Sequence, residues 1–119
     1  MADHRDLSPQ SVSEKHKAGG IILIDVREPA EFANERIHGA FLHPLSTFEP
    51  KAIPAGTDQL VVFQCGSGKR SRKALDEFRS ATGKEASHLA GGIAAWKACG
   101  LPTVKINPAT GQVEDHGRY

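Results

Sequence analysis

The sequence predicts an α/β domain with a mostly parallel sheet, and two observations carry this prediction. Short apolar runs rich in β-branched residues alternate along the chain with segments whose apolar residues recur at helical spacing. The runs at 21–26 and 60–64 are nearly continuous in apolar residues, which is typical of parallel strands covered on both faces. Such alternation favours right-handed crossovers between parallel strands.

The elements of the first half follow from local signals. We expect a helix from Pro9, capped by Ser8 and ended by Gly19, and then a strand over 21–26. A second helix begins at Pro29, since proline suits a first helical turn. A short strand over 41–43 and at most one helical turn within 46–51 complete this half.

The second half opens with a strand over 60–64 and a helix over 71–82 that Gly83 stops. A short strand over 85–89 and a helix over 93–99, capped by Gly100, come next. We expect residues 103–119 to form one short edge strand at most and then a loose tail. The chain is therefore divided into a domain over 1–104 and a tail over 105–119.

The length, composition and net charge are those of one globular domain. The chain has 119 residues, 39% of them hydrophobic and 24% charged, with a net charge of +1. Because the charge is balanced and no recognition motif is present, we expect no nucleic-acid partner. The apolar runs are too short for a membrane segment, and the polar N-terminus lacks a signal-peptide core, so the expected location is cytoplasmic.

One cysteine lies where a buried strand turns into a helix. Cys65 follows the strand over 60–64, and Gly66 and Gly68 allow the next residues to curl tightly. A curled loop can direct its N–H groups inward, and Lys69 and Arg70 add positive charge. These features favour the thiolate, so we expect the pKa of Cys65 to lie below its ordinary value. The pattern predicts a nucleophile for an anionic substrate.

Other interpretations of this stretch remain open. Cys65 could be a small core residue followed by an ordinary turn, although a core cysteine does not require a basic glycine-rich loop. Ser67 could donate its hydroxyl to a substrate or simply fit the curl. A phosphate-binding P-loop fits poorly, because the upstream glycine and the hydroxyl position are missing.

Supporting residues are expected near this loop. Asp25 closes a buried strand and should lie at the same edge of the sheet, where we favour a capping or salt-bridging role over one in orienting the loop or Arg70. Arg27 and Glu31 stand four residues apart and predict a structural ion pair. Cys99 and Trp96 are expected in the core. The histidines, His38 and His88 among them, are scattered, so no metal site is predicted.

Three stretches together resemble the rhodanese (sulfurtransferase) family: residues 23–32 with 37–40, residues 65–71, and residues 89–96 with 100–102. The resemblance spans about residues 7 to 104. It implies a five-stranded parallel sheet with helices on both faces. It also implies that Cys65 takes up a sulfane sulfur as a persulfide and passes it on. The loop that would hold the substrate is Gly66, Ser67, Gly68, Lys69, Arg70 and Ser71, with Asp25 and Arg27 in support.

The resemblance implies a sulfurtransferase without a metal or organic cofactor. Its donor would be thiosulfate or a related persulfide, and its acceptor cyanide, a small thiol or a thioredoxin-like protein thiol. Two alternatives stay open. One is a non-catalytic module that carries or senses sulfur, and the other is a cysteine phosphatase or arsenate reductase. The related phosphatases and arsenate reductases have one more residue between cysteine and arginine. The shorter loop of this chain makes a smaller cradle, which favours sulfur chemistry over binding of a tetrahedral oxyanion.

Overall fold

A computed structural model describes residues 5–54 and 58–116, and within them five strands form one parallel sheet. The strands lie in the order β1, β6, β5, β2 and β4. Their bounds are Asp6–Leu7 for β1, Ser87–Leu89 for β6, Leu60–Gln64 for β5, Ile21–Asp25 for β2 and Phe41–Leu42 for β4. The central pair, β2 and β5, runs in register from Ile21 beside Leu60 to Asp25 beside Gln64. The predicted five-stranded parallel sheet is confirmed.

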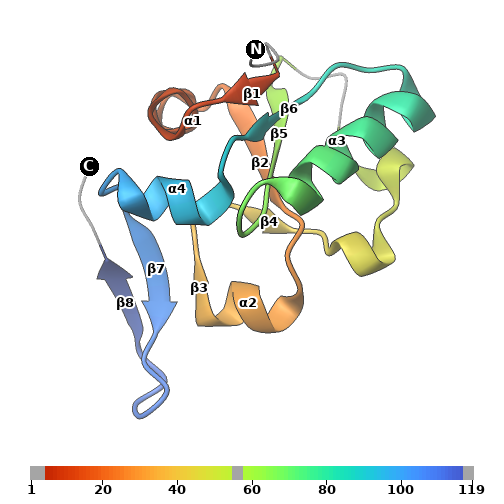
Figure 1. The fold of residues 1–119 in the computed structure, drawn as a ribbon. Helices are drawn as coiled ribbons and strands as arrows, with labels where there is room; N and C mark the ends of the chain where they lie inside the picture. Colours follow the sequence, from red (N-terminus) through yellow and green to blue (C-terminus); the bar gives the residue numbers. More distant parts are fainter. Residues whose placement is uncertain (1–4, 55–57, 117–119) are drawn as a thin grey trace.

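Helices cover both faces of this sheet, as predicted (Figure 1). On one face, α1 (Pro9–Lys17) and α4 (Gly92–Ala98) bury Val12 and Trp96 against the sheet. On the other face, α3 (Lys69–Thr82) packs Phe78 edge-on against Phe63, with ring centroids 5.5 Å apart. Trp96 of α4 and Phe78 of α3 thus anchor the two helical layers to the sheet, and both side chains are fully buried. No helix in the described part of the chain has the length and apolarity needed to cross a membrane.

The local signals place most elements correctly. Ser8 caps α1 by accepting a hydrogen bond from the Ser11 N–H at 3.1 Å. Gly83 ends α3 in the left-handed conformation, with φ of 70°. The α3 helix begins at Lys69, two residues earlier than expected, because Gly68 takes a φ of 104° and closes the loop sooner. The remaining short elements are α2 (Pro29–Asn34) and two 3-10 turns, Leu45–Thr47 and Pro50–Ala52.

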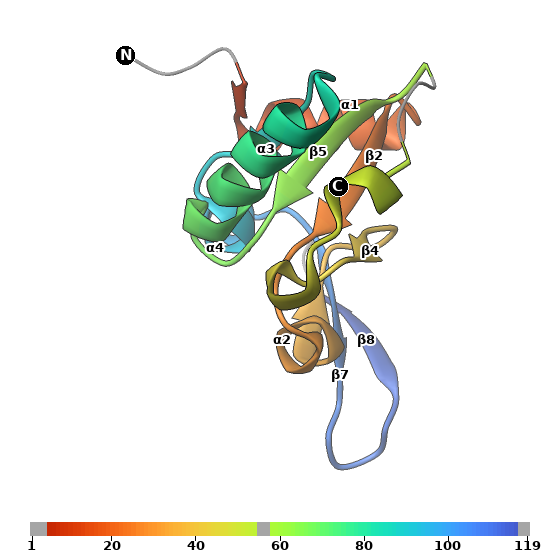
Figure 2. The ribbon, with the colours of Figure 1, turned by 90° about the vertical axis from the view of Figure 1, so that its right-hand side faces the viewer.

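The C-terminal segment differs from the expected loose tail. Strands β7 (Thr103–Ile106) and β8 (Val113–His116) form an antiparallel hairpin, and β7 also pairs with β3 (Glu35–Arg36). The hairpin extends away from the parallel sheet (Figure 2). The sequence signal is weak because β8 holds one apolar residue and owes its conformation to pairing with β7. The expected boundary after residue 104 falls within β7, and the division into domain and tail stays a prediction.

Cys99 is not in the core. Helix α4 ends at Ala98, so Cys99 lies just beyond it and is exposed, with the Gln10 side-chain amide donating to its sulfur at 3.3 Å. Trp96 is fully buried, as predicted, and its ring N–H donates to the Pro102 carbonyl at 2.8 Å. The two cysteines therefore occupy opposite environments, since Cys65 is buried.

Candidate active site

The sulfur of Cys65 lies inside a curl of hydrogen-bond donors. Cys65 follows the last residue of β5, at the carboxyl edge of the sheet, where parallel α/β sheets bind ligands. Its Sγ accepts hydrogen bonds from the N–H groups of Gly68 at 3.0 Å and Ser71 at 3.3 Å. The Ser71 hydroxyl lies 3.6 Å from the same sulfur. The residue is only 1% exposed, so water does not compete for these donors.

The loop favours the charged form of this cysteine. Burial raises the pKa of the Cys65 thiol, but hydrogen bonds from Ser71, Gly68 and Ser67 together outweigh burial and leave the pKa below its ordinary value. The direction agrees with the prediction from the glycine-rich sequence. The Ser71 hydroxyl is the side-chain donor of this group. The other donors are backbone N–H groups of the loop and of the first turn of α3.

The start of α4 holds the outer edge of the loop. The N–H of Ile93 donates to the Cys65 carbonyl at 2.8 Å, and the N–H of Ala94 donates to the Gly66 carbonyl at 3.1 Å. Gly92 permits this close approach, because a Cβ there would overlap the Cys65 carbonyl oxygen. The loop carbonyls therefore face α4 while loop N–H groups face the sulfur.

The charged residues around the loop pair differently from the prediction. Arg27 and Glu31 do not form an ion pair. Glu31 instead binds Arg70 of the loop through two hydrogen bonds of 2.7 and 3.0 Å. The Arg70 hydrogen bonds lower the pKa of Glu31 to about 2. One of the two expected loop cations is therefore matched by a carboxylate, while Lys69 is exposed.

Asp25 and Arg27 form the buried ion pair of this region. The shortest distance between their charged atoms is 2.8 Å, and Arg27 also donates to the Glu35 carbonyl at 2.6 Å. Asp25 also accepts the Arg27 backbone N–H at 2.9 Å. The Asp25 carboxylate thus makes a salt bridge, one of the roles favoured from the sequence, and the hydrogen bonds described for its side chain go to Arg27. The pair fixes the segment that leads from β2 into α2.

Comparison with known families fits this geometry. The sequence pattern of the rhodanese-like domain matches residues 8–99, which include β2, the cysteine loop and the start of α4. The chain belongs to the rhodanese-like domain family.

Known proteins resemble this rhodanese-like domain in sequence and in fold. An uncharacterized protein of Synechocystis is 41% identical over 87% of the chain, which spans 58% of that protein. A sulfurtransferase of Allochromatium vinosum is 34% identical over 71% of the chain, which spans 78% of that protein. A thiosulfate sulfurtransferase from Pseudomonas aeruginosa superposes with a TM-score of 0.71 at 31% identity, covering 82% of the chain and 19% of the solved one. Sulfur transfer is therefore supported at the level of the family.

Two residues beside the loop of this rhodanese-like domain are not among those that the sequence pattern singles out. His88 of β6 binds the Ser71 hydroxyl through Nδ1 at 2.9 Å, and its Nε2 lies 2.7 Å from the Asp6 carboxylate of β1. They come together because Asp6 and His88 are partners across neighbouring strands. With two residues, β1 is too short for a periodic signal, and the strand predicted over 85–89 carries no mark of its partner.

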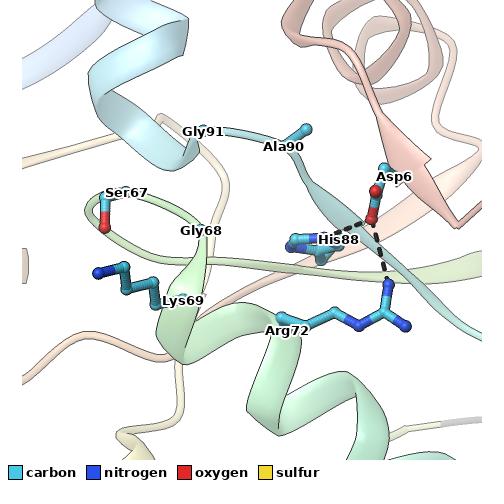
Figure 3. Close-up of a pocket in the computed structure, with 8 residues that line it drawn as sticks. All are labelled: Asp6, Ser67, Gly68, Lys69, Arg72, His88, Ala90 and Gly91. Carbon is cyan, nitrogen blue, oxygen red and sulfur yellow. Dashed lines mark hydrogen bonds and ion pairs between the residues drawn. The ribbon is translucent and has the colours of Figure 1, made fainter. Parts of the chain in front are cut away.

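Asp6 and His88 also line an open pocket of about 490 Å³ beside the loop. Figure 3 shows the Asp6 carboxylate joined to both His88 and Arg72, with Lys69 further along the pocket. The other lining residues are Ser67, Gly68, Ala90 and Gly91. Ser67 is exposed at the rim, and Gly68 donates to Cys65. Within the described chain, no group of three or more His, Cys, Asp or Glu side chains is placed to hold a metal ion.

Proposed function

We propose that this domain is a sulfurtransferase that carries a sulfane sulfur on Cys65. The observation that carries the proposal is the ring of donors around Sγ, with Gly68 N at 3.0 Å and Ser71 N at 3.3 Å. These N–H groups stabilise the Cys65 thiolate that attacks the donor and that departs again when the sulfur is passed on. A buried structural cysteine would have no use for such a cluster of donors.

The reaction has two displacements. The Cys65 thiolate attacks the outer sulfur of thiosulfate, the bond between the two sulfur atoms of thiosulfate breaks, and sulfite leaves with the electron pair. Cys65 then holds a persulfide. Cyanide or a thiolate attacks the outer sulfur of that persulfide, and Cys65 departs as a thiolate. Because sulfite is a stable anion, the first step requires no strong general acid.

Charge around the pocket supports an anionic donor. Lys69 is exposed on the pocket wall, and Arg72 lies on the same wall at the next turn of α3. Arg70 contributes less than the sequence suggests, because Glu31 binds it at 2.7 Å. We therefore assign the larger share of donor attraction to Lys69.

Loop size supports sulfur over phosphate. Four residues, Gly66 to Lys69, separate Cys65 from Arg70. The Gly68 N–H lies 3.0 Å from Sγ, so the donors already touch the sulfur itself. A tetrahedral oxyanion on Sγ would place its oxygens further from that sulfur and would need a wider ring.

Mass spectrometry after thiosulfate treatment tests the proposal. We expect Cys65 to gain about 32 Da, one sulfur atom, and to lose it on addition of cyanide with release of thiocyanate. Cys65→Ser should gain nothing, and Cys99→Ser is the matched control that should load normally. Loading without release to cyanide or thiols would favour the sulfur-carrier role. An adduct on Cys99, or hydrolysis of an aryl phosphate in place of loading, would refute the proposal.

A further inference from the structure

A continuous line of hydrogen-bonding groups runs from the sulfur of Cys65 to the pocket. Sγ lies 3.6 Å from the Ser71 hydroxyl, which lies 2.9 Å from Nδ1 of His88, and Nε2 of His88 lies 2.7 Å from Asp6. Three of the four residues are almost fully buried: Cys65 is 1% exposed, Ser71 0% and His88 6%. The four residues come from different parts of the fold: Cys65 follows β5, Ser71 lies on α3, His88 on β6 and Asp6 on β1.

The possible proton positions along this line are few. An ionised Asp6 can only accept, so Nε2 of His88 carries a proton. When His88 is neutral, Nδ1 is an acceptor and the Ser71 hydroxyl donates to it. When His88 is charged, Nδ1 is a donor, and the single Ser71 proton is released toward another acceptor.

Two other acceptors compete for that Ser71 proton. One is Sγ at 3.6 Å, and the other is the Gly68 carbonyl at 3.1 Å. A thiolate is charged and attracts the proton more strongly than a carbonyl does. Charged His88 and ionised Cys65 therefore stabilise one another through one hydroxyl group.

We propose that Asp6, His88 and Ser71 form a proton relay that removes the Cys65 thiol proton and holds the resulting thiolate. The thiol proton passes to Ser71 Oγ while the Ser71 proton passes to Nδ1 of His88. Cys65 becomes an anion and His88 a cation, so the total charge is unchanged. Ser71 contacts the reacting sulfur, whereas His88 and Asp6 act through it as positioning residues.

Charged groups on every neighbouring element bear on this relay. The charged groups that face His88 are Asp6 of β1, whose carboxylate lies 2.7 Å from Nε2, and Arg72 and Lys69 of α3, which line the same pocket. Arg72 itself binds Asp6 at 3.3 Å and is partly neutralised there. On the far side of the loop, Arg70 is paired with Glu31. His88 lines the open pocket, so it can exchange its proton with water.

This inference rests on the proposed role of Cys65, and its test uses no sulfur donor. In a Cys99→Ser background, ultraviolet absorbance follows the Cys65 thiolate across pH. We expect Ser71→Ala to lower the thiolate fraction at pH 6 by about tenfold, the effect of losing a hydrogen bond to a charged group. Ser13→Ala is the control, because Ser13 is a buried serine of α1 whose hydroxyl has no hydrogen-bond partner in the described structure.

His88→Asn keeps an N–H near Ser71 but cannot accept a proton. We expect it to lower the thiolate fraction at pH 6 by roughly threefold or more, while the exposed His38→Asn control changes nothing. Because both residues act through one hydroxyl, Ser71→Ala combined with His88→Asn should lower the fraction no further than Ser71→Ala alone. Asp6→Asn, on an edge strand, should cause a smaller loss in the same direction and provides the test if His88 variants do not fold.

Nuclear magnetic resonance of the His88 ring provides the reciprocal measurement. Removing the sulfur with Cys65→Ala should weaken proton binding by His88. Linkage requires this factor to equal the one by which loss of the charged His88 weakens thiolate formation at Cys65. Equal titration of His88 with and without Cys65 would overturn the relay, as would additive effects of Ser71→Ala and His88→Asn. If these couplings fail while Cys65 still loads with sulfur, the sulfurtransferase proposal stands and only the relay falls.

Discussion

Arg70 of the cysteine loop is held by Glu31 of α2 through two hydrogen bonds of 2.7 and 3.0 Å. Both side chains are about two-fifths exposed, at 39% and 40%. The Oε1 oxygen of Glu31 also accepts the Glu28 N–H at 3.1 Å, as part of the capping box of α2. One carboxylate thus joins the start of α2 to the loop around the sulfur.

The Glu31–Arg70 pair should make stability depend on pH. Its Arg70 hydrogen bonds lower the pKa of Glu31 from 4.5 to about 2, so the pair stabilises the fold fully above pH 4.5 and is lost as pH falls through about 2. Because the pair is partly exposed, we expect Glu31→Gln to cost about 0.2–1 kcal/mol of unfolding free energy at pH 7. Urea unfolding measures it, with the exposed Glu77→Gln of α3 as the charge-matched control. A deficit that persisted at pH 2 would contradict the assignment.

Lys69→Ala should reduce the use of thiosulfate more than the use of an uncharged persulfide donor. Lys69 is an exposed cation on the pocket wall, so its removal should raise the KM for the anionic donor several-fold, an effect on the order of 1 kcal/mol. Added salt should weaken the same preference in the unmodified protein. Steady-state kinetics with both donors decide the matter. Lys73→Ala, one turn further along α3, should leave the preference unchanged, and an equal loss there would remove the role of Lys69.

Gly92→Ala should damage the loop without touching the sulfur. A Cβ at Gly92 would overlap the Cys65 carbonyl and the Gly66 peptide, so the loop or the start of α4 must shift. We expect a loss of more than about 2 kcal/mol of unfolding free energy and slower sulfur loading of Cys65.

Gly100→Ala at the other end of α4 is the matched control for Gly92→Ala. Gly100 has a similar φ of 77°, but a Cβ there meets nothing within 4 Å. Its cost should stay at the roughly 1–2 kcal/mol of a left-handed alanine, with normal loading. Urea unfolding and mass spectrometry of both variants make the comparison, and normal loading in Gly92→Ala would show that the loop tolerates the shift.

Arg27→Met should be strongly destabilising. It leaves the carboxylate of Asp25, which is fully buried, without its cation, and such a loss typically costs about 3–5 kcal/mol. Arg79→Met is the control, because it breaks the exposed pair with Glu85 and should cost less than about 1 kcal/mol. Chemical denaturation of the two variants measures the difference, and similar costs would mean that the Asp25–Arg27 pair is not structurally important.

Much of the fold could be predicted because its signals are local. The strand over 60–64, the glycines of the loop and the apolar face of α3 adjoin one another in the chain, so the position of Cys65 followed directly. The predicted ion pair between Arg27 and Glu31 does not form, and the reason is physical. The rule for residues four apart applies within a helix, and α2 begins only at Pro29. Arg27 therefore precedes the helix and turns back to Asp25.

The features missed by sequence depend on pairing between distant segments. Asp6 and His88 are 82 residues apart and become neighbours only through the register of β1 and β6. Similarly, β8 carries few apolar residues and is specified by β7. Cys99 follows the last residue of α4 and is exposed, although Ile93 and Trp96 of the same helix are buried. Local patterns contain no information about which distant segments become partners.

The contacts of Ile93 and Ala94 with the carbonyls of Cys65 and Gly66 bear on how this chemistry could be transplanted. The peptide planes around the sulfur are oriented by a second segment that lies beyond α3 and β6. Copying residues 65–71 into another strand–turn–helix unit would therefore transfer the side chains without their orientation. A working graft would have to carry the turn at Gly91 and Gly92 as well, which makes the smallest portable unit a pair of segments and not a single motif.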